Sequence, residues 1–191
     1  MTIACGAIIL AAGQSRRMGF NKLLANYRGK PMVVHVADAV EEAGLPAIVV
    51  LGHAEQEVRT TLVGHQLDFV LAEHHAQGLG HSVAAGIKAA PPEWQAAIIC
   101  LSDMPLISPD LLSQLAKKAS PSALVVPTFA GRRGNPVLWG RDHFDTLAAL
   151  HGDTGARMVF ERLSIQMTQF PWNDDSVLQD FDTPEALELH K

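Results

Sequence analysis

The sequence is short of cysteine and has no long block of like charge, and each shortage excludes a class of protein. Its 191 residues include only two cysteines, Cys5 and Cys100, too few for a disulfide framework or a four-cysteine zinc site. Both lie in apolar, strand-like runs, where cysteine usually acts as a small buried hydrophobe. Because 18% of the residues are charged and 48% are hydrophobic, we expect a sizeable core and no extensive disorder.

The sequence also lacks a positive net charge and an apolar run of membrane-spanning length. Its formal net charge is −5, whereas general nucleic-acid binders are usually basic. The first residues carry no basic region of a secretory signal. We therefore expect a cytoplasmic protein with no nucleic-acid partner and no membrane partner. Positive charge is concentrated locally, at residues 16–22 and 132–133, which suits small anionic ligands.

Strand-like and helix-like patterns alternate along the chain. Strands are predicted at residues 7–11, 47–51, 69–72, 96–101, 124–126, 136–139 and 165–170. Helices are predicted at residues 31–43, 54–62, 82–90, 141–150 and 154–163, and also from Ser108 and from Thr183. Such alternation, with continuous apolar strands, is typical of a mainly parallel sheet covered on both faces. The sequence therefore predicts a single α/β domain over residues 1–191.

The first strand runs directly into a loop with two glycines and three cations. Residues 12–22 read AGQSRRMGFNK. Glycines let backbone N–H groups approach an anion, and the cations neutralise it, so the loop indicates a nucleotide polyphosphate site. The alternative is an ordinary strand followed by a basic turn. The spacing of Gly13 and Gly19 fits neither a P-loop nor a dinucleotide fingerprint.

A carboxylate follows another apolar strand. Asp103 comes after residues 96–101 and precedes Met104 and Pro105. At the tip of a buried strand a carboxylate can hold Mg²⁺, although an aspartate before Pro105 can also simply form a turn. Because ligands of parallel sheets bind beyond the carboxyl ends of strands, Asp103 and the opening loop can share one crevice. His74, His75 and His81 lie close in sequence but match no zinc spacing.

Four more segments carry polar or charged residues, and the first three of them also contain glycine. They are 78–86 (GLGHSVAAG), 131–138 (GRRGNPVL), 152–157 (GDTGAR) and 180–185 (DFDTPE). Three of them also have a purely structural interpretation. The first can be a loop-to-helix junction, Arg132 and Arg133 can form a solvated turn, and Asp182 or Thr183 can be a helix N-cap.

Together these segments resemble the MobA-like nucleotidyltransferases. The opening loop resembles the signature L-A-[AG]-G-x-[SG]-x-R-M-G-x-x-K at nine fixed positions, and the later segments resemble the family's remaining motifs in order. The resemblance covers residues 8–187 and implies a three-layer α/β/α, Rossmann-like fold. The sequence departs from the family pattern at Asn135, where a histidine is usual, at Phe181, and at Ala186.

The resemblance also implies a role for each matching residue. The implied nucleotide-binding residues are Leu10, Ala11, Ala12, Gly13, Ser15, Arg17, Lys22, Gly78 and Ser82. The implied catalytic residues are Lys22, Arg17 and Asp103. Asp103 and Asp182, with Asp180 in reserve, would hold Mg²⁺ or Mn²⁺. The implied acceptor-binding residues are Arg132, Arg133, Asn135, Asp153 and Arg157.

Within the family, the 131–138 and 152–157 segments resemble the molybdopterin branch, and Ala12 resembles its cytidylyltransferases. This implies transfer of CMP from CTP to the phosphate of molybdopterin or molybdenum cofactor, with release of pyrophosphate. A molybdenum hydroxylase apoenzyme is a further expected partner. Three alternatives remain: a guanylyltransferase, a transferase for another phosphorylated acceptor, and a non-catalytic protein that delivers the cofactor.

Overall fold

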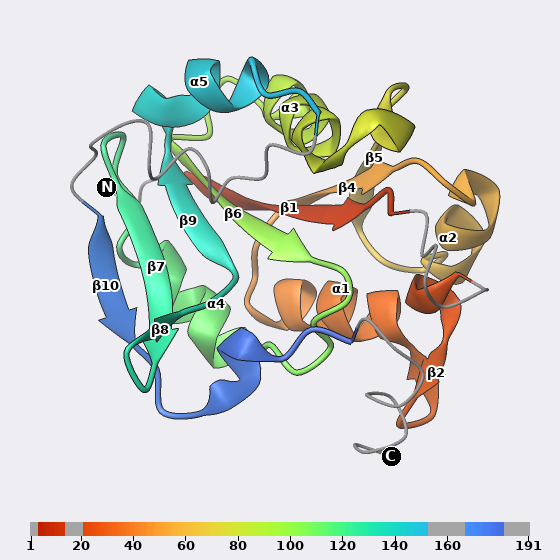
Figure 1. Cartoon of the computed structure of the whole chain (residues 1–191), viewed down its shortest axis with the longest axis horizontal. Helices are drawn as coiled ribbons and strands as arrows, with labels where there is room; N and C mark the ends of the chain where they lie inside the picture. The colour runs from red at the N-terminus through yellow and green to blue at the C-terminus, as the bar shows by residue number, and fades with distance from the viewer. Residues whose placement is uncertain (1–3, 14–20, 153–166, 182–191) are drawn as a thin grey trace.

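A single mixed sheet forms the centre of the computed structural model, which describes residues 4–13, 21–152 and 167–181 (Figure 1). Seven strands follow the order β10-β7-β9-β6-β1-β4-β5, and β8 pairs with β7. Their bounds are β1 Cys5–Ala11, β4 Ala47–Leu51, β5 Leu67–Leu71, β6 Ala96–Leu101, β7 Leu124–Phe129, β8 Arg132–Arg133, β9 Val137–Gly140 and β10 Thr168–Pro171. A separate hairpin consists of β2 (Asn26–Tyr27) and β3 (Lys30–Pro31).

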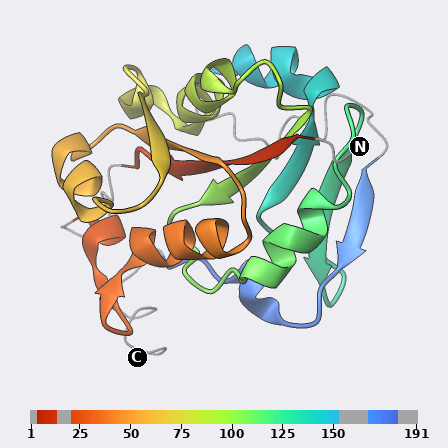
Figure 2. The same cartoon turned by 180° about the vertical axis from the view of Figure 1, so that it is seen from behind.

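Helices cover both faces of the sheet, as the two opposite views show (Figures 1 and 2). One face carries α1 (Met32–Glu42), α2 (Glu55–Thr61) and α4 (Pro109–Ala116), and the other carries α3 (Leu79–Ala89) and α5 (Phe144–Ala148). Four short 3-10 helices complete the described elements: η1 (Lys22–Leu24), η2 (His75–Gln77), η3 (Arg141–His143) and η4 (Asp175–Leu178). None of the helices described is long and apolar enough to cross a membrane. The predicted α/β/α layering is confirmed.

The alternation of side chains along β1 explains why the strand is apolar throughout. Ile9 packs into the core layer under α1 and α4, while Ile8 and Leu10 pack into the layer under α3 and α5. Successive side chains of a strand point to opposite faces, so a strand covered on both faces needs apolar residues at every position. All seven residues of β1 are buried.

The strand directions create one functional edge. β1 pairs in parallel with both β4 and β6, and β4 pairs in parallel with β5. The chain moves outward from β1 to β4 and β5, then crosses back over α3 to β6 on the other side of β1. Such a reversal opens a crevice at the carboxyl ends of the strands beside the reversal point, here β1 and β6.

The predicted elements agree best with the structure where an apolar strand or a helix cap fixes them. The strands predicted at residues 47–51 and 96–101 have the observed bounds, and Ser108 caps α4 by accepting a hydrogen bond from Leu111 N at 3.2 Å. The helix predicted at 82–90 instead begins at Leu79, and that predicted at 141–150 divides into η3 and α5. The helices predicted at 154–163 and from Thr183 lie outside the described residues.

Both cysteines are buried, as the sequence predicts. Cys100 is fully enclosed in β6, and Cys5 is almost so at the start of β1. Burial raises the pKa of the Cys5 thiol to about 12 and raises that of Cys100 above its usual range. Thiolates are the reactive form of cysteine, so neither side chain is suited to nucleophilic chemistry.

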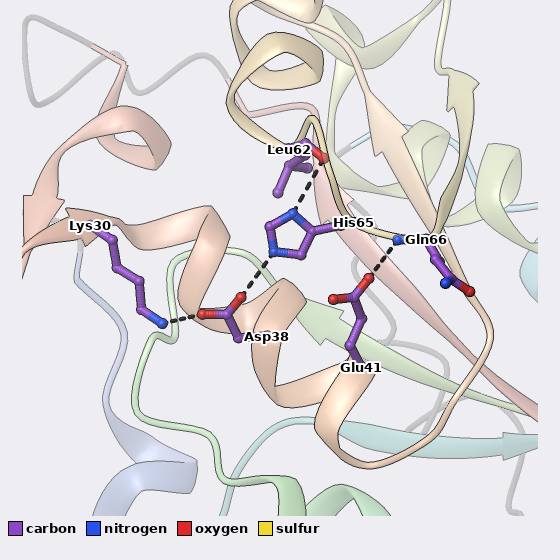
Figure 3. A network of polar contacts seen from close by, with 6 residues as sticks. All are labelled: Lys30, Asp38, Glu41, Leu62, His65 and Gln66. Carbon is purple, nitrogen blue, oxygen red and sulfur yellow. Dashed lines mark hydrogen bonds and ion pairs between the residues drawn. The ribbon is translucent and has the colours of Figure 1, made fainter.

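A polar network fastens α1 to the segment between α2 and β5 (Figure 3). The Asp38 carboxylate accepts hydrogen bonds from Lys30 Nζ and, at 2.9 Å, from His65 Nε2. Three residues further along α1, Glu41 accepts the backbone N–H of Gln66 at 2.5 Å. Burial alone would raise the pKa of Asp38, but the hydrogen bonds and charges of Lys30 and His65 outweigh it and lower that pKa.

We expect Asp38→Asn to lower the free energy of unfolding by about 1 kcal/mol at neutral pH, since the neutral amide no longer attracts the Lys30 ammonium. A carboxyl whose pKa is lower in the folded state stabilises above its unfolded pKa, about 3.9, and loses that effect as pH falls through the folded-state value. The difference between wild type and variant should therefore shrink below about pH 4. Urea unfolding at pH 7 and pH 3 measures it, with Glu93→Gln on an exposed side chain as control; a difference that is the same at both pH values contradicts this role.

Candidate active site

Two loops that lie far apart in the sequence meet through one ion pair. Lys22 Nζ donates to Asp103 Oδ2 at 2.6 Å, and the two side chains are only 13% and 19% exposed. Lys22 begins η1, which Asn21 caps by accepting Leu23 N. Asp103 follows β6, and its neighbour Ser102 donates through Oγ to Leu10 O at 2.5 Å. The ends of β1 and β6 are thus joined at the crevice.

The second carboxylate oxygen of Asp103 has the character of an open cation ligand. Oδ1 is buried, and no hydrogen-bond partner lies on it among the residues the structure describes. A buried polar atom without a partner is costly, so it favours a ligand that can fill its coordination. Carboxylate oxygen is the donor that Mg²⁺ and Mn²⁺ accept in proteins. The residues present therefore fit a divalent cation at Asp103.

The segment after β10 brings the C-terminal motif to Asp103. Phe181 N donates to Asp103 O at 3.0 Å. The ring centroids of Phe181 and Tyr27 are 5.1 Å apart, and both rings belong to a small cluster with Met32. Phe181 therefore anchors the chain directly beside the proposed metal ligand. Asp180 is exposed. Asp182, the sequence-predicted ligand, lies outside the described residues.

The predicted acceptor residues stand on an exposed ribbon linked to the same segment. Arg132 and Arg133 are exposed on β8, which continues from β7 through a tight turn. At the foot of the ribbon Asn135 N donates to Val177 O at 2.9 Å. A Cβ at Gly134 would lie 2.2 Å from Val177 O, so only glycine allows this approach. Asp153 and Arg157 lie outside the described residues.

The predicted nucleotide residues divide into buried and accessible positions. Leu10, Ala11 and Ala12 are buried, whereas Gly13 is exposed and has open space where a side chain would be. Gly78 precedes α3 at the N-cap, and Ser82 is only 4% exposed in the first turns of that helix. Ser15 and Arg17 lie outside the described residues. Backbone groups are therefore the main accessible donors of the described part of this region.

A histidine that matched no motif also lies at this edge of the sheet. His75 lies in η2 after β5, and its Cγ would be 2.6 Å from a Cβ at Gly52, which follows β4. His74 and His81 come together with ring centroids 5.7 Å apart. No group of three metal-ligating side chains occurs among the described residues. The contact between His75 and Gly52 joins two separate loops, so no sequence spacing could have indicated it.

Comparison with known proteins identifies the family of this chain. Residues 7–167 match the model of the MobA-like NTP transferase domain. The chain belongs to that family. The MobA-like fold is also confirmed by the structure of Rv0371c from Mycobacterium tuberculosis H37Rv, which has a TM-score of 0.87 and 25% identity and covers 99% of this chain and 98% of that one. A structure of Rv0371C in complex with manganese matches with a TM-score of 0.81 and 24% identity, over 97% of each chain.

Two curated proteins are also similar to this chain. The purine catabolism protein PucB of Bacillus subtilis is 28% identical over 95% of this chain and 93% of its own length. The bifunctional protein GlmU of Syntrophomonas wolfei is 33% identical over 71% of this chain. This chain spans only about 30% of GlmU, so the likeness to GlmU concerns one part of a longer protein.

We expect Lys22→Met to lower the free energy of unfolding by about 1–3 kcal/mol, because it leaves the Asp103 carboxylate without its charged partner. Added Mn²⁺ should raise the melting temperature more in the variant than in wild type, since the cation can replace the lost ammonium charge. Thermal unfolding with and without Mn²⁺ measures both effects, and Lys117→Met, on an exposed lysine of the turn after α4, is the control. Equal stability of the Lys22 variant, or an equal gain with Mn²⁺, contradicts the expectation.

Proposed function

We propose that this protein is a divalent-metal-dependent cytidylyltransferase that transfers CMP from CTP to the phosphate of molybdopterin or molybdenum cofactor. The observation that carries the proposal is the Lys22–Asp103 pair with its open Oδ1, at the carboxyl ends of β1 and β6 of a MobA-like chain. A cation next to a free carboxylate oxygen suits a polyphosphate bound with a divalent metal. The proposed recipient of the product is a molybdenum hydroxylase apoenzyme.

The reaction requires positioning and charge stabilisation rather than a protein nucleophile. An oxygen of the acceptor phosphate forms a bond to the α-phosphorus of CTP while the bond from that phosphorus to the β-phosphate bridging oxygen breaks, and pyrophosphate leaves. The Lys22 ammonium stabilises the charge that develops at the α-phosphate, and Arg17 with the N–H groups near Gly13 holds the β- and γ-phosphates. Gly13 is exposed enough to do so.

Asp103 and Asp182 would hold the divalent cation. When bound, Mg²⁺ or Mn²⁺ neutralises phosphate charge and polarises the α-phosphate. Two hydrogen bonds hold the backbone around Asp103 for this role: Ser102 Oγ donates to Leu10 O, and Phe181 N donates to Asp103 O. The manganese complex of the similarly folded Rv0371C supports the choice of a divalent metal.

Exposed positive charge at the same edge of the sheet as Asp103 supports the proposed binding of the acceptor phosphate. β7 runs parallel to β6, because both are antiparallel to β9, so the ribbon with Arg132 and Arg133 extends from the same edge as Asp103. Exposed guanidinium groups can bind a phosphate through paired hydrogen bonds. The proposal assigns Arg132, Arg133, Asn135, Asp153 and Arg157 to the binding of the pterin acceptor, with the arginines on its phosphate.

The preference for CTP over GTP rests on Ala12. Ala12 is only 3% exposed, and its methyl group packs against Gly52. It would therefore act on the base indirectly, by fixing the position of the Gly52 backbone. A single methyl group discriminates by about 1–3 kcal/mol. That is enough for a preference and too little for absolute selection.

Pyrophosphate release tests the proposal. CTP and GTP are each supplied with Mg²⁺, with and without molybdenum cofactor. We expect release only with CTP and the cofactor together. Release with GTP instead assigns the protein to the guanylyltransferases, and no release from protein that still binds CTP favours another acceptor or a delivery role.

Replacement of Lys22 tests its role in the chemical step. We expect Lys22→Ala to reduce kcat on the order of 10²–10³, by analogy with loss of one preorganised charge-stabilising group. Lys117→Ala, at the end of α4 and beside Ala4 and Cys5 at the start of β1, is the control and should keep wild-type kcat. Near-normal turnover of the Lys22 variant, measured at saturating CTP, would remove Lys22 from the chemistry.

A further inference from the structure

Three loops meet at the carboxyl ends of β1, β4 and β5, on the side of β1 that faces away from β6. Ala12 follows β1, Gly52 follows β4 and His75 follows β5, and these parallel strands are neighbours in the sheet. A Cβ at Gly52 would lie 2.6 Å from His75 Cγ and 2.7 Å from Ala12 Cβ. The imidazole therefore packs directly on the backbone of Gly52, beside the residue that follows β1. The absence of a side chain at position 52 makes this packing possible.

One hydrogen bond fixes which ring nitrogen of His75 carries the proton. His75 Nδ1 lies 2.9 Å from the backbone oxygen of Ala72. A carbonyl oxygen can only accept, so Nδ1 is the donor, and in the neutral ring Nε2 then carries a lone pair. The backbone N–H of His75 donates to the same oxygen at 3.0 Å, which fixes the start of η2. The ring is thus held by both its backbone and its side chain.

The Nε2 atom is the free end of this arrangement. Nε2 is on the far side of the ring from Cγ, so it points away from the Gly52 backbone on which Cγ packs. None of the residues that the structure describes hydrogen-bonds to Nε2, and the His75 side chain is only half-buried. The ring therefore directs Nε2 toward the carboxyl edge of β1, β4 and β5.

We propose that His75 Nε2 accepts a hydrogen bond from the exocyclic amino group of the nucleobase and so makes the site prefer CTP to UTP. This inference rests on the proposed function, because it places the base of the CTP substrate on the Ala12–Gly52–His75 side of the crevice. Cytosine has a 4-amino group that donates to the lone pair. Uracil has an oxygen at that position, which would face the same lone pair without a proton between them.

The neighbouring histidine serves as an internal comparison. His74 lies in the same loop but is exposed, its Nδ1 is 3.5 Å from Gln77 Nε2, and its ring contacts that of His81. Its side chain is therefore directed to η2 and α3 rather than to the Gly52 backbone. A change at His74 alters the charge and bulk of the loop while leaving the His75 acceptor in place.

Amide replacements separate the two nitrogens of His75. The amide of asparagine reaches the position of Nδ1 and can still donate to Ala72 O, but it has no group at the position of Nε2. The amide of glutamine reaches the position of Nε2 and can supply an acceptor there. His75→Asn therefore removes the proposed contact, His75→Gln restores it, and His74→Asn is the matched control.

Calorimetric titration with CTP and with UTP, each in the presence of Mg²⁺, provides the readout. We expect wild type to bind CTP about tenfold more tightly than UTP. The hydrogen bond from the cytosine amino group strengthens the binding of CTP, whereas the unpaired His75 Nε2 weakens the binding of UTP. His75→Asn should bring the two affinities to within about threefold, mainly by weakening CTP. His75→Gln and His74→Asn should keep most of the wild-type ratio. A purely structural role of His75 would weaken both nucleotides equally.

An unchanged ratio in His75→Asn, or equal binding of UTP and CTP by wild type, overturns the inference. Its failure differs from failure of the proposed function. If wild type prefers CTP in a His75-dependent way but releases no pyrophosphate with molybdenum cofactor, the base contact stands and the assigned acceptor is wrong. If pyrophosphate is released but the ratio of the CTP and UTP affinities is the same in wild type and in His75→Asn, the transferase stands and the base contact is wrong.

Discussion

The parallel pairing of β1 with β6 is the constraint on which the candidate site depends. Its register places Leu10 opposite Leu101, so the loops that follow the two strands leave the sheet side by side. The Ser102 hydroxyl then bonds to Leu10 O, and Lys22 meets Asp103 across 81 positions of sequence. A slip of one residue would move every side chain of β1 to the opposite helical layer. The double burial of β1 therefore fixes the position of Asp103 as firmly as it fixes the core.

The ion pair at this junction uses only one of the two oxygens of the Asp103 carboxylate. Holding two charged groups in a largely buried place costs solvation, which their attraction offsets only when the geometry is good. Here Lys22 satisfies one carboxylate oxygen and leaves the other buried without a partner among the described residues. A buried oxygen without a partner costs free energy, so this carboxylate would gain from a further cationic partner.

How far the sequence predicts the molecule depends on whether the signal is local. The apolar runs of β4 and β6 and the Ser108 cap gave correct boundaries, because burial on both faces and a helix N-cap are visible in a few consecutive residues. The hairpin of β2 and β3, the strand β8 and the early start of α3 were missed. Two-residue strands carry no periodicity, and Gly78 at an N-cap has no side chain to signal a helix start. His75 was missed for another reason, since its setting is made by Ala12 and Gly52 from different loops.

The segment from η4 to Phe181 contacts both the β7–β8 ribbon and the backbone of Asp103. Val177 O accepts the N–H of Asn135 at the foot of the β7–β8 ribbon, and four residues later Phe181 N donates to Asp103 O. Both contacts are made by backbone atoms, and Gly134 allows the first by having no side chain. The distance between the arginine ribbon and Asp103 is therefore set by main-chain geometry. Side chains on the ribbon can vary to suit a different acceptor without moving Asp103, which is how one fold can support several transfer reactions.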